Sequence, residues 1–374
     1  MSRTLLQDAA PHTSEPIEAE TLSHHPNPLA EHYRAFDVEH RLLLTGHSHQ
    51  AWPDVARRGQ VAAFEDAAEQ VDGKWEAAFE KASRVRRDFA RWVGDPPAAA
   101  EARYALAANT HELLVRFLSA LPLAERPRLV TTDGEFHSMR RQLDRLAETG
   151  IEVVRVAVDP LDALADRLAA AIDDRTAAVL VSTVLFRDAR RVPGLERAAQ
   201  AARRHGAEIL VDLYHQLGAV PFDLEAAGLG DAFAVGGGYK YLQLGEGNCF
   251  LRVPPDRDLR PAVSGWFAEF VDLAATPSGE VAYGRGADAF LGATYDPTSH
   301  YRACEVMDFF AAQGLDAERL RRLSQAQVTR LAHGVDALDL DPRTLVRPAV
   351  AIDQLGGFLA LEAPGAESLR RRLL

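Results

Sequence analysis

The 374-residue chain has the composition of an ordinary globular protein, with 47% apolar and 26% charged residues. Its length allows one large domain and a smaller one. A net charge of −12 argues against binding to nucleic acid or to an acidic membrane surface, because both select basic proteins. The two cysteines are too few for a disulfide framework, and their scarcity fits a reducing cytosol.

The N-terminal segment carries acids and prolines where a signal peptide needs an apolar core, so we expect a cytoplasmic protein. Residues 1–28 lack apolar periodicity and are predicted to form a mobile arm. The longest apolar runs, such as 177–186, are too short to span a bilayer. They are typical of buried strands.

Apolar runs bounded by turn residues then alternate with helical patterns. The runs that favour strands are 102–108, 128–131, 152–156, 177–183, 208–211, 232–235 and 249–253. The patterns that favour helices are 112–121, 139–148, 161–172 and 195–205. This alternation predicts an α/β fold with a mainly parallel sheet.

The pattern changes after about residue 298. Two long amphipathic helices are expected at 301–313 and 317–333, and one strand at 358–361. We therefore predict a large α/β domain over 29–297 and a smaller C-terminal α+β domain over 298–374. Residues 368–374 have the pattern of an amphipathic helix with no strand after it, so we expect the small domain to be truncated.

The segment 209–250 carries the most informative residues. An apolar strand places Asp212 at its carboxyl end, and His215 follows three residues later. A second strand ends in three glycines followed by Tyr239 and Lys240, and the glycines permit a sharp turn and a close approach of the backbone. In an open α/β sheet the ligand crevice lies outside the carboxyl ends of the strands. Asp212 and Lys240 are therefore expected to face one crevice.

An aspartate and a lysine in that arrangement suit pyridoxal 5′-phosphate (PLP). The lysine carries the cofactor as a Schiff base, and the aspartate keeps the pyridine nitrogen protonated. Each residue alone has a simpler interpretation, as a turn residue for Asp212 and a surface residue for Lys240. Together they favour a PLP enzyme in which both are catalytic. Attack by the amine requires its neutral form, so we expect the pyridinium and partial burial to lower the Lys240 pKa.

The motifs at 212–215 (D-L-Y-H) and 239–242 (Y-K-Y-L) resemble the PLP core of the class V aminotransferases, and most of all kynureninase. The resemblance covers about residues 40–374 and implies PLP fold type I. It implies that Asp212 contacts the pyridine nitrogen and that His215 lies near the phenolate oxygen of the ring. It also implies that Tyr239 binds the cofactor phosphate.

Weaker resemblances add further candidates for the cofactor site. Thr110 and His111 open a helix whose N–H groups would bind the phosphate, although an ordinary helix cap explains the same residues. Phe136 is similar to the aromatic residue that stacks on the ring, and Trp266 to a tryptophan that reaches the phosphate. A core position is the simpler interpretation of both. Thr294 lies in a segment, 286–294, that resembles one lent by a second subunit, which implies a homodimer with a shared active site.

The loop 44–53 and the segment after the 177–183 strand supply the candidate substrate residues, His47, Ser48 and Arg187. No carboxylate or thiol completes a metal site around the pairs His47/His49 or His24/His25, so no metal is expected.

His47 and His49 depart from the kynureninase pattern in the loop 44–53, and two further departures remove polar contacts. Met139 replaces an aspartate and Leu185 replaces an asparagine, and the family's carboxylate-binding arginine lies beyond Leu374. We therefore expect little or no hydrolysis of kynurenine itself.

The function that this resemblance implies is a kynureninase-like hydrolysis, which cleaves a C–C bond in the side group of an amino acid. Transamination or β-elimination on the same scaffold remains open. A cysteine desulfurase is disfavoured, because Cys249 falls in a strand and Cys304 in a helix instead of on a C-terminal loop. A non-catalytic sensor of PLP or of an amino acid would have lost Lys240 or Asp212, and neither is lost.

Overall fold

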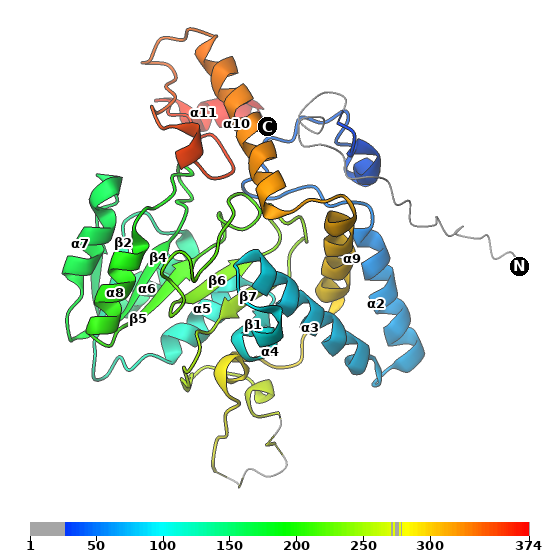
Figure 1. The fold of residues 1–374 in the computed structure, drawn as a ribbon, viewed down its shortest axis with the longest axis vertical. Coiled ribbons are helices and arrows are strands. Elements are labelled where there is room, and N and C mark those ends of the chain that lie inside the picture. The colour runs from blue at the N-terminus through cyan, green and yellow to red at the C-terminus, as the bar shows by residue number, and fades with distance from the viewer. Residues whose placement is uncertain (1–26, 271, 274–276, 278, 374) are drawn as a thin grey trace, which may run out of the picture.

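A seven-stranded sheet lies at the centre of the computed structural model (Figure 1). The structure describes residues 27–270, 272–273, 277 and 279–373, so the predicted arm at 1–28 lies outside the described residues except for its last two. The strands are β1 (Tyr104–Ala107), β2 (Arg128–Thr132), β3 (Glu152–Val156), β4 (Thr176–Ser182), β5 (Glu208–Asp212), β6 (Phe233–Gly237) and β7 (Cys249–Arg252).

The strand order is β1-β7-β6-β5-β4-β2-β3. The five strands from β6 to β3 run parallel, whereas β7 and β1 form an antiparallel edge. The α/β fold and the mainly parallel sheet expected from the sequence are therefore confirmed. Each predicted strand of the large domain is found within two residues of its expected ends.

Alternation along the strands separates two hydrophobic layers. In β4, Val179 and Val181 face one layer while Ala178 and Leu180 face the other, and all four are buried. The first layer contains apolar residues of α3 (Lys74–Trp92), α7 (Leu164–Ala171) and α8 (Leu195–Arg204). The second contains those of α5 (Thr110–Ser119) and α6 (His137–Ala147). Both faces of the sheet are thus covered, as parallel sheets require.

Helices α2 (Ala56–Gln70) and α9 (Thr298–Ala312) pack beside α3 (Figure 1). Gly59 permits this close packing, because a Cβ at that position would lie 2.5 Å from the backbone oxygen of Tyr301. The polypeptide after residue 298 therefore begins with a helix packed on elements from the N-terminal part of the protein.

Helix α10 (Ala317–Asp336) leads into a C-terminal region, with α11 (Ala366–Leu373) near its end (Figure 1). The strand expected at 358–361 is wrong, because these residues form no strand. The nearest pairing is one isolated bridge between Val346 and Glu362. No neighbouring strand among the described residues therefore forms hydrogen bonds with the backbone of residues 358–361. The Phe358 ring packs instead against the rings of His47 and His215.

The remaining elements are short. They are η1 (Ala30–Phe36), η2 (Pro97–Ala99), α4 (Ala100–Arg103), η3 (Leu161–Ala163), η4 (Trp266–Glu269), η5 (Gly286–Phe290) and η6 (Ile352–Gln354). Within the described residues, no helix is long and apolar enough to cross a membrane.

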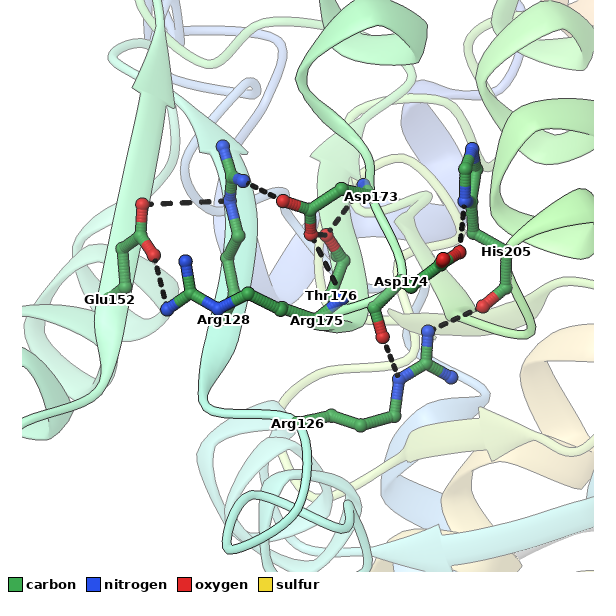
Figure 2. A network of polar contacts seen from close by, with 8 residues as sticks. All are labelled: Arg126, Arg128, Glu152, Asp173, Asp174, Arg175, Thr176 and His205. Carbon is green, nitrogen blue, oxygen red and sulfur yellow. Dashed lines mark hydrogen bonds and ion pairs between the residues drawn. The ribbon is translucent and has the colours of Figure 1, made fainter.

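A polar network joins the amino ends of β3, β2 and β4, at one side of the sheet (Figure 2). Arg128 at the start of β2 forms ion pairs with Asp173 and, at 3.7 Å, with Glu152 at the start of β3. Glu152 also pairs with Arg175 at 2.9 Å. Arg126 donates to the backbone oxygen of Asp174 at 3.1 Å. The expected face for a ligand is the opposite edge, since ligands of open α/β sheets bind outside the carboxyl ends of the strands.

Candidate active site

Lys240 lies at the centre of a group of aromatic and imidazole rings. Its side chain is buried, with 5% of the residue exposed, and Nζ lies 2.6 Å from Nε2 of His215. The same Nζ lies 5.1 Å, 5.6 Å and 5.8 Å from the ring centroids of Tyr214, Phe136 and Tyr239. The fold therefore gathers four residues proposed from the sequence, Phe136, His215, Tyr239 and Lys240, around one amine.

The glycines before Lys240 are required by close packing. A Cβ at Gly237 would lie 2.2 Å from the Tyr214 hydroxyl, and one at Gly238 would lie 2.3 Å from a methyl group of Leu244. Real Cβ atoms do not approach other atoms so closely. Only glycine lets this segment leave β6 at the depth that buries the lysine.

Asp212 is the last residue of β5, and its Oδ1 accepts a hydrogen bond of 2.8 Å from the backbone N–H of Tyr214. Burial raises the Asp212 pKa, while the Tyr214 N–H and the Lys240 ammonium oppose that rise. Burial lowers the Lys240 pKa to about 8, and the Asp212 charge partly opposes the fall. A lowered Lys240 pKa was expected from the sequence, and in the protein alone burial produces it.

His215 is buried and neutral. Burial and the charges of Lys240 and His47 lower its pKa to about 3. Since Nε2 faces the Lys240 amine, the ring proton is assigned to Nδ1, which is buried without a hydrogen-bond partner among the described residues. An unpaired buried donor is costly, so it indicates a place for a ligand acceptor.

The loop that carries His47 and Ser48 lies against this group. The His49 ring stacks on Tyr239 at 5.2 Å, and Nδ1 of His49 lies 3.0 Å from the Ser48 hydroxyl. The His47 ring lies 4.9 Å from that of Phe358. Burial and the nearby Lys240 charge lower the His47 pKa. The loop and the C-terminal region therefore both contribute rings beside Lys240.

Helix α5 begins close to the same group. Asn109 caps it by accepting from the Glu112 N–H at 3.0 Å, which is the cap that the sequence allowed as the simpler interpretation. The Thr110 hydroxyl lies close enough to Tyr214 and Cys249 to affect their pKa values. It is nevertheless buried without a partner of hydrogen-bond geometry among the described residues. His111 is exposed on the first turn.

Sequence reasoning missed two residues of this region. Glu135 is buried at the carboxyl end of β2, directly before Phe136, and its pKa is affected by Asp212. Phe358 packs on His47 and His215 from more than a hundred residues away. The first could have been found as the neighbour of the proposed stacking aromatic. The second has no local signal, because only folding brings it there.

Three other residues singled out in the sequence have different surroundings. Arg187 is exposed and lines a cavity of about 300 Å³ with Asp159, Leu355 and Leu359, and none of the rings around Lys240 lines that cavity. Met139 and Leu185, noted as departures from kynureninase, are both 2% exposed in hydrophobic clusters.

The segments of Trp266 and Thr294 lie beside each other. The Gly265 N–H donates to the Leu291 oxygen at 3.0 Å, and the Phe267 N–H donates to the Gly292 oxygen at 3.0 Å. Trp266 is 41% exposed, and Thr294 is also exposed. The alternative of a core tryptophan is therefore wrong, because the ring lies at the protein surface.

Comparison with known proteins places this site in context. The kynureninase of Xanthomonas campestris pv. campestris (strain B100) is 32% identical over 196 residues, covering 49% of this protein and 45% of that enzyme. The kynureninase of Burkholderia mallei (strain SAVP1) is 34% identical over 186 residues, covering 49% and 41%. The matched region thus spans less than half the length of these relatives. No protein-family model matches the sequence.

Among solved structures, a mutant of C-DES with glycine covalently linked to the PLP cofactor has a TM-score of 0.78 to this protein at 17% identity. The match covers 92% of this protein and 89% of that one. The fold is therefore fold type I of the PLP-dependent enzymes. About half of the sequence is similar to kynureninases, which confirms the resemblance seen in the sequence.

Proposed function

We propose that the protein binds PLP through Lys240 and uses it to act on an amino acid. The observation that carries this proposal is the buried Lys240 amine, whose pKa is lowered to about 8 and which lies beside His215 and Asp212. The similarity to kynureninases and to the C-DES fold supports it. When bound, PLP supplies an electron sink that stabilises negative charge on the α-carbon of the amino acid.

The residues present fit this cofactor. Two buried polar atoms, the Thr110 hydroxyl and Nδ1 of His215, have no hydrogen-bond partner among the described residues. Both could donate to oxygen atoms of PLP. Asp212 supplies a carboxylate for the ring nitrogen, and Phe136 supplies a ring near the amine. The start of α5 supplies N–H groups for the phosphate, with Tyr239 as a further donor.

The proton chemistry is assigned to the residues nearest the amine. With a pKa of about 8, Lys240 holds its proton at neutral pH in most molecules and gives it up at little cost, which suits a residue that must move a proton. His215 stays neutral, and its Nε2 accepts a hydrogen bond from the Lys240 amine over 2.6 Å, which orients that amine. Asp212 would hold a proton on the ring nitrogen of the bound cofactor. We assign contacts with the substrate to His47 and Ser48.

The proposed reaction is hydrolytic cleavage of a C–C bond in the side group of an amino acid, supported by the sequence similarity to kynureninase. Transamination or β-elimination is the alternative. A desulfurase with a cysteine nucleophile is not supported, because both described cysteines are buried. Burial also raises the pKa of each thiol, to about 11 for Cys304.

A homodimer with a shared site is part of the proposal. Three exposed aromatic side chains lie together, Phe79, Trp266 and Phe270. The ring centroid of Phe270 lies 5.3 Å from that of Trp266 and 6.4 Å from that of Phe79. An exposed apolar patch of this kind favours a protein partner. We assign the patch to a second copy of the protein, to whose phosphate site Thr294 and Trp266 would contribute.

The test is to trap the cofactor and to offer substrates. Borohydride should bleach the visible absorbance of the PLP-loaded protein and fix the label on Lys240 and not on Lys74 or Lys81, the other two lysines of the sequence. Amino acids, kynurenine included, are then added while the spectrum is followed, and anthranilate release is measured by fluorescence. A label on another lysine would overturn the proposal. Turnover of kynurenine on the order of ten per second would show that Met139 and Leu185 are harmless.

A further inference from the structure

The buried carboxyl of Glu135 has no part in the function proposed above. The residue is 4% exposed and lies in the turn between β2 and α6. Its Oε1 accepts from the Thr132 hydroxyl at 2.6 Å, and its Oε2 accepts from the Ser182 hydroxyl at 2.6 Å. The Ser182 N–H is 3.3 Å from Oε1. One side chain thereby joins the carboxyl ends of β2 and β4.

Glu135 is also close to Asp212 through the sheet. Ser182, which donates to Glu135, is paired in register with Asp212 on β5. The groups that face the Glu135 carboxyl are the Thr132 hydroxyl from β2, the hydroxyl and N–H of Ser182 from β4, and the Asp212 carboxylate from β5. No cation is among them. Burial raises the Glu135 pKa to about 7, and the like charge of Asp212 contributes to the rise.

A purely structural tie between β2 and β4 would not need an ionisable group. An amide would reach the same two hydroxyls, and it would avoid the cost of a buried carboxylate that has no cation beside it. What the carboxyl adds is a negative charge that can appear and disappear near neutral pH, next to Asp212.

We propose that Glu135 is a positioning residue of the active site, which ties β2 to β4 beside Phe136 and, through its charge, raises the proton affinity of Asp212 and of the Lys240 amine. The inference rests on the proposed function, since Asp212 and Lys240 act there on the cofactor. When Glu135 is ionised, the field at Asp212 is more negative, so protons on the groups facing Asp212 are held more firmly.

The experiment compares Glu135→Gln with the unchanged protein, both loaded with PLP. Glutamine keeps the size of the side chain and its hydroxyl partners, but not the charge. The absorbance of the lysine-bound cofactor is titrated with pH. We expect the midpoint to fall by about half to one pH unit, because a nearby negative charge that favours the protonated, cationic form is worth about that much in a protein.

Two controls separate charge from structure. Ser182→Ala removes one hydrogen bond and keeps the carboxyl, and Asp88→Asn removes a buried carboxyl of α3 that is paired with Arg84 away from the site. Asp88→Asn should keep the midpoint within about 0.2 pH unit, a shift too small for a lost neighbouring charge. Ser182→Ala removes a hydrogen bond to the charged carboxylate and so raises the Glu135 pKa, and it should move the midpoint in the same direction as Glu135→Gln but by less. An unchanged midpoint in Glu135→Gln, or an equal shift in Asp88→Asn, would overturn the proposal.

A second measurement uses the cofactor-free protein, so it decides the matter even if Glu135→Gln does not fold. Folding raises the Glu135 pKa from 4.5 to about 7. The free energy of unfolding should therefore decline as pH rises from about 4.5 to about 7. In Asp212→Asn the decline should end at lower pH, since the like charge is gone. An identical pH dependence would refute the coupling. Failure of PLP to label Lys240 would instead refute the proposed function and leave this result standing.

Discussion

Replacing Lys240 by methionine should stabilise the cofactor-free protein at neutral pH. The lysine is 5% exposed, and burial lowers its pKa from 10.5 to about 8. The folded site therefore binds a proton more weakly than the unfolded state does. Methionine has a similar length and no charge, so Lys240→Met removes the cost of placing an ammonium group in this position.

The magnitude follows from the difference in pKa. A fall from 10.5 to about 8 corresponds to ~3 kcal/mol of unfolding free energy at about pH 7. The cost is fully present below about pH 8, where both states are protonated, and it disappears as pH rises through the unfolded pKa. Lys240→Met should therefore gain up to ~3 kcal/mol at about pH 7 and less than ~1 kcal/mol at about pH 10.

The assay is urea unfolding at the two pH values, followed by tryptophan fluorescence. Lys81→Met is the matched control, because Lys81 is partly exposed over the Tyr301 ring, and its effect should stay within about 0.5 kcal/mol. A gain for Lys240→Met that is absent at about pH 7, or that is equally large at about pH 10, would show that burial does not hold the Lys240 pKa down. The variant should also fail to attach PLP covalently.

Three further predictions concern the site, the fold and the assembly. Asp212→Ala should keep some PLP but lose turnover by orders of magnitude, because an unprotonated ring is a poor electron sink; near-normal activity would rule out this role. Arg252→Met should lower the unfolding free energy by about 3 kcal/mol, because it removes the buried guanidinium that bonds Asp95 at 2.9 Å and 3.0 Å and leaves that carboxylate with Arg103 and Tyr104. A loss under about 1 kcal/mol in urea unfolding would contradict that reasoning. The protein should sediment as a dimer at micromolar concentration and Phe270→Glu should shift it toward monomer, whereas an unchanged dimer would place the interface elsewhere.

Local patterns were sufficient for the sheet and for the core of the site. The run at 177–183 is apolar on both faces, as a strand buried between two helical layers must be, and β4 occupies 176–182. Asp212 ends β5, and Lys240 follows β6, the neighbouring parallel strand. The expectation of a parallel sheet was therefore enough to predict that both face one crevice.

Contacts between distant segments were decided only by the tertiary structure. The apolar residues at 358–361 suit a strand, but a strand requires a neighbour to pair with, and the fold provides only one bridge there among the described residues. Phe358 reaches His47 and His215 because the C-terminal region folds back over the carboxyl ends of the strands. The pKa of Lys240 and that of Glu135 depend on burial and on neighbours from other strands, so the residue types alone could not determine them.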